Sequence, residues 1–240
     1  MNKNSNLYIV IYSTVMVVVV ATLLAVAALA LKSRQDANIL NEKKQAILAS
    51  LSLEGQNYDE VIEAYVVNEN GEKIEGQDPI QLLFDLPTAF AENTLPVFQA
   101  EDGRIVVPVS GVGLWGPMWG YVALEKDMNT ISGIVLDHAG ETPGLGAEVA
   151  TPKHQAMYKG KTLFEGDEFV SVTLRKGGAK DEKHEVDAIS GGTKTSDGVT
   201  AMLRTSLGAY QPLLKAAAAP CCEACTEATE CETNNVENNE

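Results

Sequence analysis

The stretch from Leu7 to Leu31 constrains this chain more than any other. It reads LYIVIYSTVMVVVVATLLAVAALAL and contains no charged side chain. A helix rises about 1.5 Å per residue, so about 20 apolar residues cross a bilayer core of roughly 30 Å. The run is longer than the apolar region of a cleaved signal peptide, so we predict an uncleaved transmembrane anchor over residues 1–32. The small residues of AVAALA leave cleavage open as an alternative.

The charges beside this stretch say little about its orientation. Lys3 precedes it, and four basic residues follow it: Lys32, Arg34, Lys43 and Lys44. Counting Lys and Arg alone would place the C-terminal side in the cytoplasm. The difference is small, and acidic residues are mixed in.

Charge and cysteine positions exclude two classes of site. The formal net charge is -15 and no basic cluster occurs, so a nucleic-acid partner is not expected. Between the anchor and residue 220 there is no cysteine, which excludes a disulfide framework or a cysteine-based metal site there. The three histidines, which have no metal-ligand spacing between them, are His138, His154 and His184. We therefore predict no metal site in the folded region.

Residues 33–99 are expected to form a helical linker and the N-terminal part of a soluble domain. SRQDANILNEKKQAILASLSL reads as a helix that continues the anchor or caps the domain. IEAYVVN reads as a short strand followed by a turn at Asn70-Gly71. Residues 76–100 contain Pro79, Pro87 and Pro96 and read as irregular.

Residues 100–215 are expected to form the principal domain. RIVVPVSG reads as an edge strand because it contains a proline, and two strand-like runs around the turn from Glu125 to Asn129 predict a hairpin. Thr151 and Pro152 predict a helix start, with an end at Gly160. EFVSVTLRKGG and HEVDAI read as further strands, and an amphipathic helix runs from Thr195 to near Lys215. The predicted fold class is α+β, an antiparallel sheet flanked by helices.

Residues 216–240 read as an acidic, disordered tail. Six glutamates occur there without a basic residue, and the tail holds all four cysteines of the chain: Cys221, Cys222, Cys225 and Cys231. The C-x-x-C spacing of Cys222 and Cys225 suits a soft metal or a disulfide. A tail without a function is the alternative.

Two glycine-rich stretches are candidate ligand loops. GVGLWG, residues 111–116, fits G-x-G-x-x-G, but Pro117 and a strand-like run follow it where a dinucleotide site needs a helix. It therefore predicts a turn between strands, where Trp115 and Trp119 either stack on an aromatic ligand or pack in the core. HAGETPGLGAEV combines flexible glycines with polar and apolar side chains. It predicts either a ligand loop or a plain solvent loop.

DAISGGTKTSDGV, residues 187–199, carries the chemistry that is easiest to interpret. Two glycines lie in a run of hydroxyl residues at the start of a helical pattern. A helix N-terminus has unpaired N–H groups and a partial positive charge, which together suit a phosphate. Ser190, Thr195 and Ser196 offer further donors. A hydroxyl-rich N-cap without a ligand is the alternative, and the spacing does not say whether a phosphate would be free or bonded.

DAISGGTKTS resembles the covalent flavinylation motif Asp-x-x-Ser-Gly-Ala-Thr-x-Thr-Ser of the FMN-binding domain family, with Gly192 in place of the usual alanine. The resemblance implies that a flavin transferase joins FMN through its phosphate to Thr193. It makes Asp187, Ser190 and Gly191 recognition residues, and it places Gly192 and Thr195 in the cofactor site.

GLWGPMWGYVAL followed by ETPGLGAEV narrows the resemblance to the C subunits of Na+-translocating NADH:quinone oxidoreductases. The G subunit of the Rnf complex shares the flavin motif and the ETPGLG loop, but its counterpart of the Trp115 region reads more like Gly-Tyr-x-Gly-Pro. The resemblance covers the anchor and about residues 100–210. The residues expected to surround the flavin ring or contact FMN are Trp115, Glu141, Thr142, Gly144, Leu145 and Gly146. The tail departs from the family.

The resemblance implies an electron-transfer subunit of a six-subunit complex that couples NADH oxidation and ubiquinone reduction to Na+ transport. Electrons would pass between redox centres of the membrane, flavin and iron–sulfur subunits, and this chain would not be active alone. It also implies a location in the bacterial inner membrane, with the FMN domain on the periplasmic side. The rival hypothesis is a non-redox, membrane-anchored module that binds a phosphorylated ligand.

Overall fold

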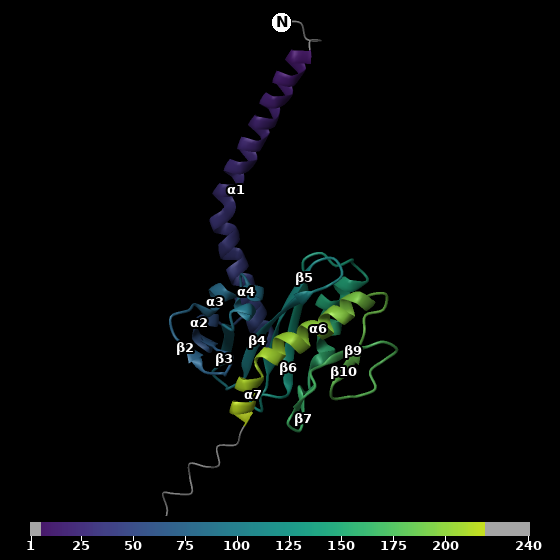
Figure 1. Cartoon of the computed structure of the whole chain (residues 1–240). Helices are drawn as coiled ribbons and strands as arrows, with labels where there is room; N and C mark the ends of the chain where they lie inside the picture. The colour runs from purple at the N-terminus through teal and green to yellow at the C-terminus, as the bar shows by residue number, and fades with distance from the viewer. Residues whose placement is uncertain (1–5, 219–240) are drawn as a thin grey trace, which may run out of the picture. The chain divides into compact units, whose positions relative to one another are not determined.

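The computed structural model describes residues 6–218 of the chain, in two compact units. The first unit ends at Ala46 and the second begins at Ile47. The helix α1, Asn6–Ser50, contributes to both (Figure 1).

The first unit is the long N-terminal helix. Its most apolar window has a mean hydropathy of 2.8, and none of that window is buried within the protein. By length and composition α1 can cross a membrane, which fits the predicted anchor. The hydroxyls of Ser13 and Thr22 donate to the carbonyl oxygens of Val10 and Val18, so they are satisfied inside the helix. The predicted continuation of the anchor as helix is confirmed up to Ser50.

The second unit is built on a six-stranded antiparallel sheet in the order β2-β1-β3-β4-β5-β6 (Figure 1). Its strands are β1 (Ile62–Val67), β2 (Lys73–Ile74), β3 (Leu95–Ala100), β4 (Ile105–Val112), β5 (Pro117–Leu124) and β6 (Ile131–His138). The helices are α2 (Tyr58–Val61), α3 (Pro79–Leu82), α4 (Leu86–Ala91), α5 (Pro152–Gln155), α6 (Thr193–Ala209) and α7 (Gln211–Ala218). Two 3-10 turns are η1 (Gly146–Ala150) and η2 (Ala156–Tyr158). The α+β class is thereby confirmed.

The predicted β5–β6 hairpin is present. Its turn is fixed by Asp127, whose carboxylate accepts hydrogen bonds from the amides of Asn129 and Thr130 and from the Thr130 hydroxyl. Such side-chain bonds to the following backbone are typical of turns that begin with aspartate.

The prediction that RIVVPVSG is an edge strand is wrong, because β4 lies between β3 and β5. The proline is tolerated because β3 pairs with β4 only at Ile105 and Val106. Beyond that point helix α6 takes the place of a strand. The Ser206 hydroxyl accepts from the Ser110 amide and donates to the Ser110 carbonyl, both at 3.1 Å. Pro108 lies two residues earlier, on the same side of the strand, where no strand needs its missing N–H.

The prediction that residues 76–100 are irregular is also wrong. They form α3, α4 and β3. Asp78 and Asp85 cap the two helices, and a proline occupies the first turn of each. Proline is favoured there because the first N–H groups of a helix have no partner.

The C-terminal amphipathic helix begins at Thr193 and is split in two at Tyr210. The buried side chains of α6 are Thr195, Ser196, Val199, Met202, Leu203, Ser206 and Leu207. Tyr210 is fully buried and donates its hydroxyl to the Pro96 carbonyl at 2.9 Å. Helix α7 runs to Ala218, three residues into the segment expected as tail, and the four cysteines lie outside the described residues.

The segment EFVSVTLRKGG forms two short strands, β8 (Glu168–Phe169) and β9 (Thr173–Arg175), where one was predicted. Ser171, at a φ of 64°, bends the chain between them. β7 (Phe164–Glu165) pairs with β8, and β10 (Glu185–Asp187) pairs with β9 in parallel. The antiparallel pattern therefore holds for the main sheet and not for this pair, which delivers the chain to the start of α6.

Candidate functional site

Three segments that are distant in sequence meet at one end of the sheet. They are the β4–β5 turn, the loop after β6 and the start of α6. The Thr195 hydroxyl donates to Glu141 Oε2 at 2.7 Å, and the Trp115 amide donates to Glu141 Oε1 at 2.9 Å. A Cβ added at Gly192 would lie 3.4 Å from the Gly146 Cα. The structure therefore brings together both glycine-rich stretches and the hydroxyl-rich motif.

Glu141 lies at the centre of this junction. Its side chain is 5% exposed, and no Lys or Arg forms an ion pair with it in the described part of the chain. Burial by itself would raise the pKa of this carboxyl. Hydrogen bonds from the Trp115 amide, the Thr195 hydroxyl and the Leu114 amide, together with nearby His138, lower the pKa below its usual value. Glu141 is therefore a buried carboxylate at neutral pH.

Two of the hydroxyls in the motif are fully used by the fold. Thr195 is 1% exposed and donates to Glu141. Ser196 is equally buried; its hydroxyl donates to the Gly192 carbonyl and accepts from the Ile189 amide. Both side chains therefore close the site from inside, and direct contact of Thr195 with a cofactor stays a prediction.

Thr193 is placed differently, although it lies in the same turn. It is the first residue of α6, it is partly exposed, and its hydroxyl has no hydrogen bond to any described residue. The N-cap, Gly192, supplies no side-chain bond to the helix start. The first amides of α6 are therefore left for another acceptor. Ser190 and Gly191 are exposed beside them, and Gly191 has a φ of 72°, which favours glycine.

Apolar side chains are exposed around this helix start. Trp115 is 66% exposed, and Val112, Leu114 and Leu145 are also exposed. A Cβ added at Gly191 would lie 2.5 Å from Leu145 Cδ2, so Leu145 lies directly against the backbone of the motif. Trp119 is only partly exposed. Exposed apolar groups beside unpaired amides are the two surfaces that a flat ring carrying a phosphate needs.

The remaining predicted residues flank this junction. Thr142 is exposed, and its carbonyl accepts from the amides of Leu145 and Ala147, which folds the loop into a tight turn. Gly144 has a φ of 74° and nothing within 4 Å of its Cβ position. Asp187 is exposed at the end of β10 and accepts from the Ala179 amide at 2.7 Å. All twelve predicted residues thus lie in the three meeting segments or in β10, which leads into them.

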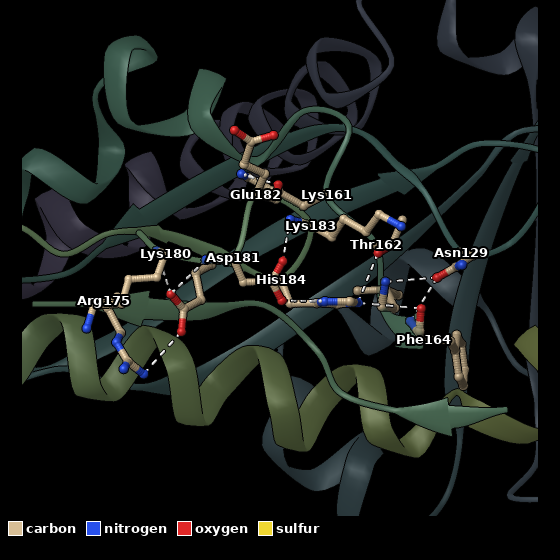
Figure 2. Close-up of polar contacts among 12 residues, drawn as sticks. Asn129, Lys161, Thr162, Phe164, Arg175, Lys180, Asp181, Glu182, Lys183 and His184 are labelled. Carbon is tan, nitrogen blue, oxygen red and sulfur yellow. Dashed lines mark hydrogen bonds and ion pairs between the residues drawn. The ribbon is translucent and has the colours of Figure 1, made fainter. Parts of the chain in front are cut away.

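Sequence reasoning missed the network that holds β10 in place (Figure 2). His184 is 5% exposed, with Nδ1 at 2.9 Å from Asp181 Oδ2 and Nε2 at 3.0 Å from Thr162 Oγ1. The Thr162 amide also donates to the Lys183 carbonyl. A hydroxyl, an imidazole and a carboxylate in series resemble a catalytic triad. Here, however, both flanking backbones are engaged, so the network fixes the segment that leads to Asp187.

No group of His, Cys, Asp or Glu side chains in residues 6–218 could hold a metal ion. A hollow of about 330 Å³ lies elsewhere, at β1 and β3, and is lined by Glu60, Val61, Ile62, Glu63, Gln99, Ala100 and Glu101. None of these residues belongs to the three meeting segments. Acidic side chains would repel a phosphate, so we place the candidate site at the start of α6.

Known proteins resemble this chain over most of its length. The FMN-binding domain family matches residues 113–208, which include all three meeting segments. The C subunit of the Na(+)-translocating NADH-quinone reductase of Neisseria meningitidis is 34% identical, over 75% of this chain and 81% of that protein. The C subunit of the Pseudomonas aeruginosa reductase is 33% identical, over 86% and 93% of the two chains.

Two solved structures share the fold. The crystal structure of the Na(+)-translocating NADH-quinone reductase C subunit from Parabacteroides distasonis has a TM-score of 0.71 and 44% sequence identity, and the match covers 77% of this chain and 96% of that one. Shewanella oneidensis NqrC has a TM-score of 0.65 and 28% identity, over 77% and 100% of the chains. The chain belongs to the family of C subunits of Na+-translocating NADH-quinone reductases.

Proposed function

We propose that this chain is the FMN-carrying electron-transfer subunit of a Na+-translocating NADH:quinone reductase, with FMN joined through its phosphate to Thr193. One observation carries the assignment of the acceptor. Of the two threonines in the motif, Thr195 is buried and bonded to Glu141, whereas Thr193 is partly exposed and unbonded at the first position of α6. A nucleophilic hydroxyl must be reachable by its donor, and Thr193 meets this condition.

The surroundings of Thr193 suit the product of such a reaction. The negative charge of a phosphodiester would lie at the unpaired amides and positive end of α6. Attachment needs an activated donor such as FAD. The phosphorus of its FMN half forms a bond to Thr193 Oγ1 while the bond between the two phosphates breaks, AMP leaves and the hydroxyl proton is released. A flavin transferase would carry out this step.

When bound, the flavin accepts and donates electrons one or two at a time. The protein's contribution would be a tether that prevents loss of FMN and an apolar surface that orients the ring. Trp115 and Leu145 are the exposed apolar groups nearest the motif that can provide this surface. We infer that electrons arrive from an iron centre in the membrane subunits and leave to a flavin in another membrane subunit.

The location follows from the same proposal. α1 would anchor the chain once in the bacterial inner membrane, with the FMN-binding unit on the periplasmic side. The basic residues that follow the anchor favour the opposite orientation, so this point needs its own test. Proteolysis of spheroplasts should cleave the second unit while the membrane is intact. Protection of that unit until the membrane is lysed would contradict the periplasmic placement.

The attachment itself is tested by mass spectrometry of the full chain produced with a flavin transferase. We expect the mass of FMN on the peptide that contains Thr193, and yellow fluorescence that stays on the band in a denaturing gel. Thr193→Ala should remove both, and Thr193→Ser, which keeps a hydroxyl, should retain them at least in part. Flavin mapped to Thr195 would refute the acceptor. A colourless protein despite an active transferase would favour the non-redox phosphate-binding module.

A further inference from the structure

The junction contains an arrangement that flavin attachment alone does not require. Glu141 Oε1 accepts from the Trp115 amide of the β4–β5 turn, and Oε2 accepts from the Thr195 hydroxyl of α6. The two oxygens of one carboxylate therefore hold two different segments. Those segments carry the exposed Trp115 ring and, two residues before Thr195, the acceptor Thr193.

The carboxylate is enclosed as closely as the backbone permits. A Cβ added at Gly113 would lie 2.3 Å from Oε1, and one at Gly146 would lie 2.3 Å from Oε2. The turn itself is closed by the Gly113 amide, which donates to the Gly116 carbonyl at 2.8 Å. The amide of Glu141 donates to His138 Nδ1 at 3.2 Å, which fixes where the loop leaves β6. Small movements of either segment would therefore break a bond to Glu141.

Stability alone is a weak reason for such a residue. Burying a carboxylate without a cation is unfavourable, and apolar side chains could fill the same space. What the carboxylate supplies is direction, because each hydrogen bond fixes one segment at a set distance from the other. It also puts a full negative charge beneath the turn that presents Trp115.

We propose that Glu141 is a positioning residue that ties the Leu114–Trp115 turn to Thr195, and so holds the ring-binding surface and the attachment point at a fixed separation. The part of this proposal that concerns FMN rests on the proposed function. Its charge has a second consequence. A buried carboxylate beside the flavin disfavours the added electrons of the reduced ring, so Glu141 lowers the midpoint potential.

The test uses the full chain, produced with a flavin transferase, and the variants Glu141→Gln and Thr195→Val, which keep side-chain shape. Glu148→Gln is the matched control, because it removes an exposed carboxylate from the same loop. Thr195→Ser, which restores the hydroxyl, should behave like the wild type. We expect Glu141→Gln to raise the flavin midpoint potential and shift its absorption, whereas Glu148→Gln leaves both unchanged.

Amide hydrogen exchange gives a second readout that needs no flavin. In Glu141→Gln the Trp115 amide should exchange about tenfold faster, because a neutral acceptor replaces a charged one. In Thr195→Val the same amide should also exchange faster, although its own bond is untouched. That transmission is what a tie predicts and what two independent bonds would not produce.

The outcomes separate the two proposals. Wild-type protein without covalent flavin refutes the attachment, while hydrogen exchange still tests the tie in the apoprotein. Normal attachment combined with an exchange rate and a potential in Glu141→Gln that match those of Glu148→Gln would overturn the role of Glu141. If Glu141→Gln fails to fold, Thr195→Val, which removes one bond only, decides the question by the exchange of Trp115.

Discussion

At the residue scale, Gly146 shows how little room the junction leaves. The position has an ordinary φ, so strain in the backbone is not the issue, but a Cβ there would lie 2.3 Å from Glu141 Oε2 and 2.5 Å from Thr195 Oγ1. Gly146→Ala should therefore force the pair apart. We expect a loss of about 1–3 kcal/mol in the free energy of unfolding, the usual range for an overpacked core.

The control for Gly146→Ala is Gly140→Ala in the same loop. A Cβ at Gly140 would meet only the Trp115 carbonyl, at 3.8 Å, an ordinary contact. Urea unfolding of both variants measures the difference. Equal stability of the two would mean that the junction opens without cost and that its close packing is not important to the fold.

His154 makes the stability of the second unit depend on pH. Burial lowers the pKa of its imidazole below 6.5, although Asp187 acts in the opposite direction. As pH falls below 6.5, the unfolded chain takes up the proton before the folded one does. The free energy of unfolding should therefore fall from about pH 6.5 downward until the folded-state pKa is passed.

His154→Gln, which cannot take up the proton, should flatten this part of the pH profile. The variant also disturbs the contact of His154 Nε2 with the Tyr158 hydroxyl, at 3.1 Å, so its absolute stability will differ from that of the wild type. The slope is the quantity to compare. An unchanged slope between about pH 6.5 and pH 5 would assign the pH dependence to another group.

At the scale of elements, the seam between α6 and β4 is the least usual feature of the sheet. Ser206 is 2% exposed, and its hydroxyl satisfies both the amide and the carbonyl of Ser110. Ser206→Ala would leave two buried backbone groups without a partner, so we expect a loss of about 1–3 kcal/mol. Thr205→Ala, at an exposed neighbour without a hydrogen bond in the described part of the chain, should stay within about 0.5 kcal/mol of the wild type. If both variants lose equally, the helix matters and the seam does not.

The sequence predicts those elements whose determinants are local. The β5–β6 hairpin and the start of α6 follow from alternation and turn residues near each of them in the chain. β3 was missed because Pro79, Pro87 and Pro96 read as interruptions, whereas two of them open capped helices and the third gives its carbonyl to Tyr210. The position of β4 in the sheet depends on α6, almost 100 residues later, which no local pattern reveals.

The candidate site divides in the same way. The motif around Thr193 could be identified because its residues are consecutive, and the glycines of the two loops mark places where backbones approach closely. The partnership of Glu141 with Thr195 could not be predicted, since 54 residues separate them and a glutamate in a loop is usually solvated. The sequence likewise gives no sign that Thr195 and Ser196 are consumed by the fold, while Thr193 is left free.

At the scale of the whole molecule, the boundary between anchor and soluble unit falls later than the end of the apolar stretch. The second unit begins at Ile47, and Ile47, Leu48 and Leu51 are at most 1% exposed. The Ser50 carbonyl lies so close to Gly133 that a Cβ there would meet it at 2.2 Å, and Arg104 donates to the Leu51 carbonyl. The last turn of α1 is therefore part of the soluble core.

We expect a fragment that starts at Asn41 to fold as a soluble, cooperative unit and one that starts at Gly55 to be far less stable. The shorter fragment loses three buried aliphatic side chains, each contributing about 1.5–3 kcal/mol. A fragment that starts at Lys32 is the control, because residues 32–39 are exposed and should add no stability. Urea unfolding of the three measures the boundary. Equal stability of the fragments from Asn41 and Gly55 would show that the last turn of α1 belongs to the anchor alone, and that the buried apolar contacts at Ile47, Leu48 and Leu51 do not hold the soluble unit together.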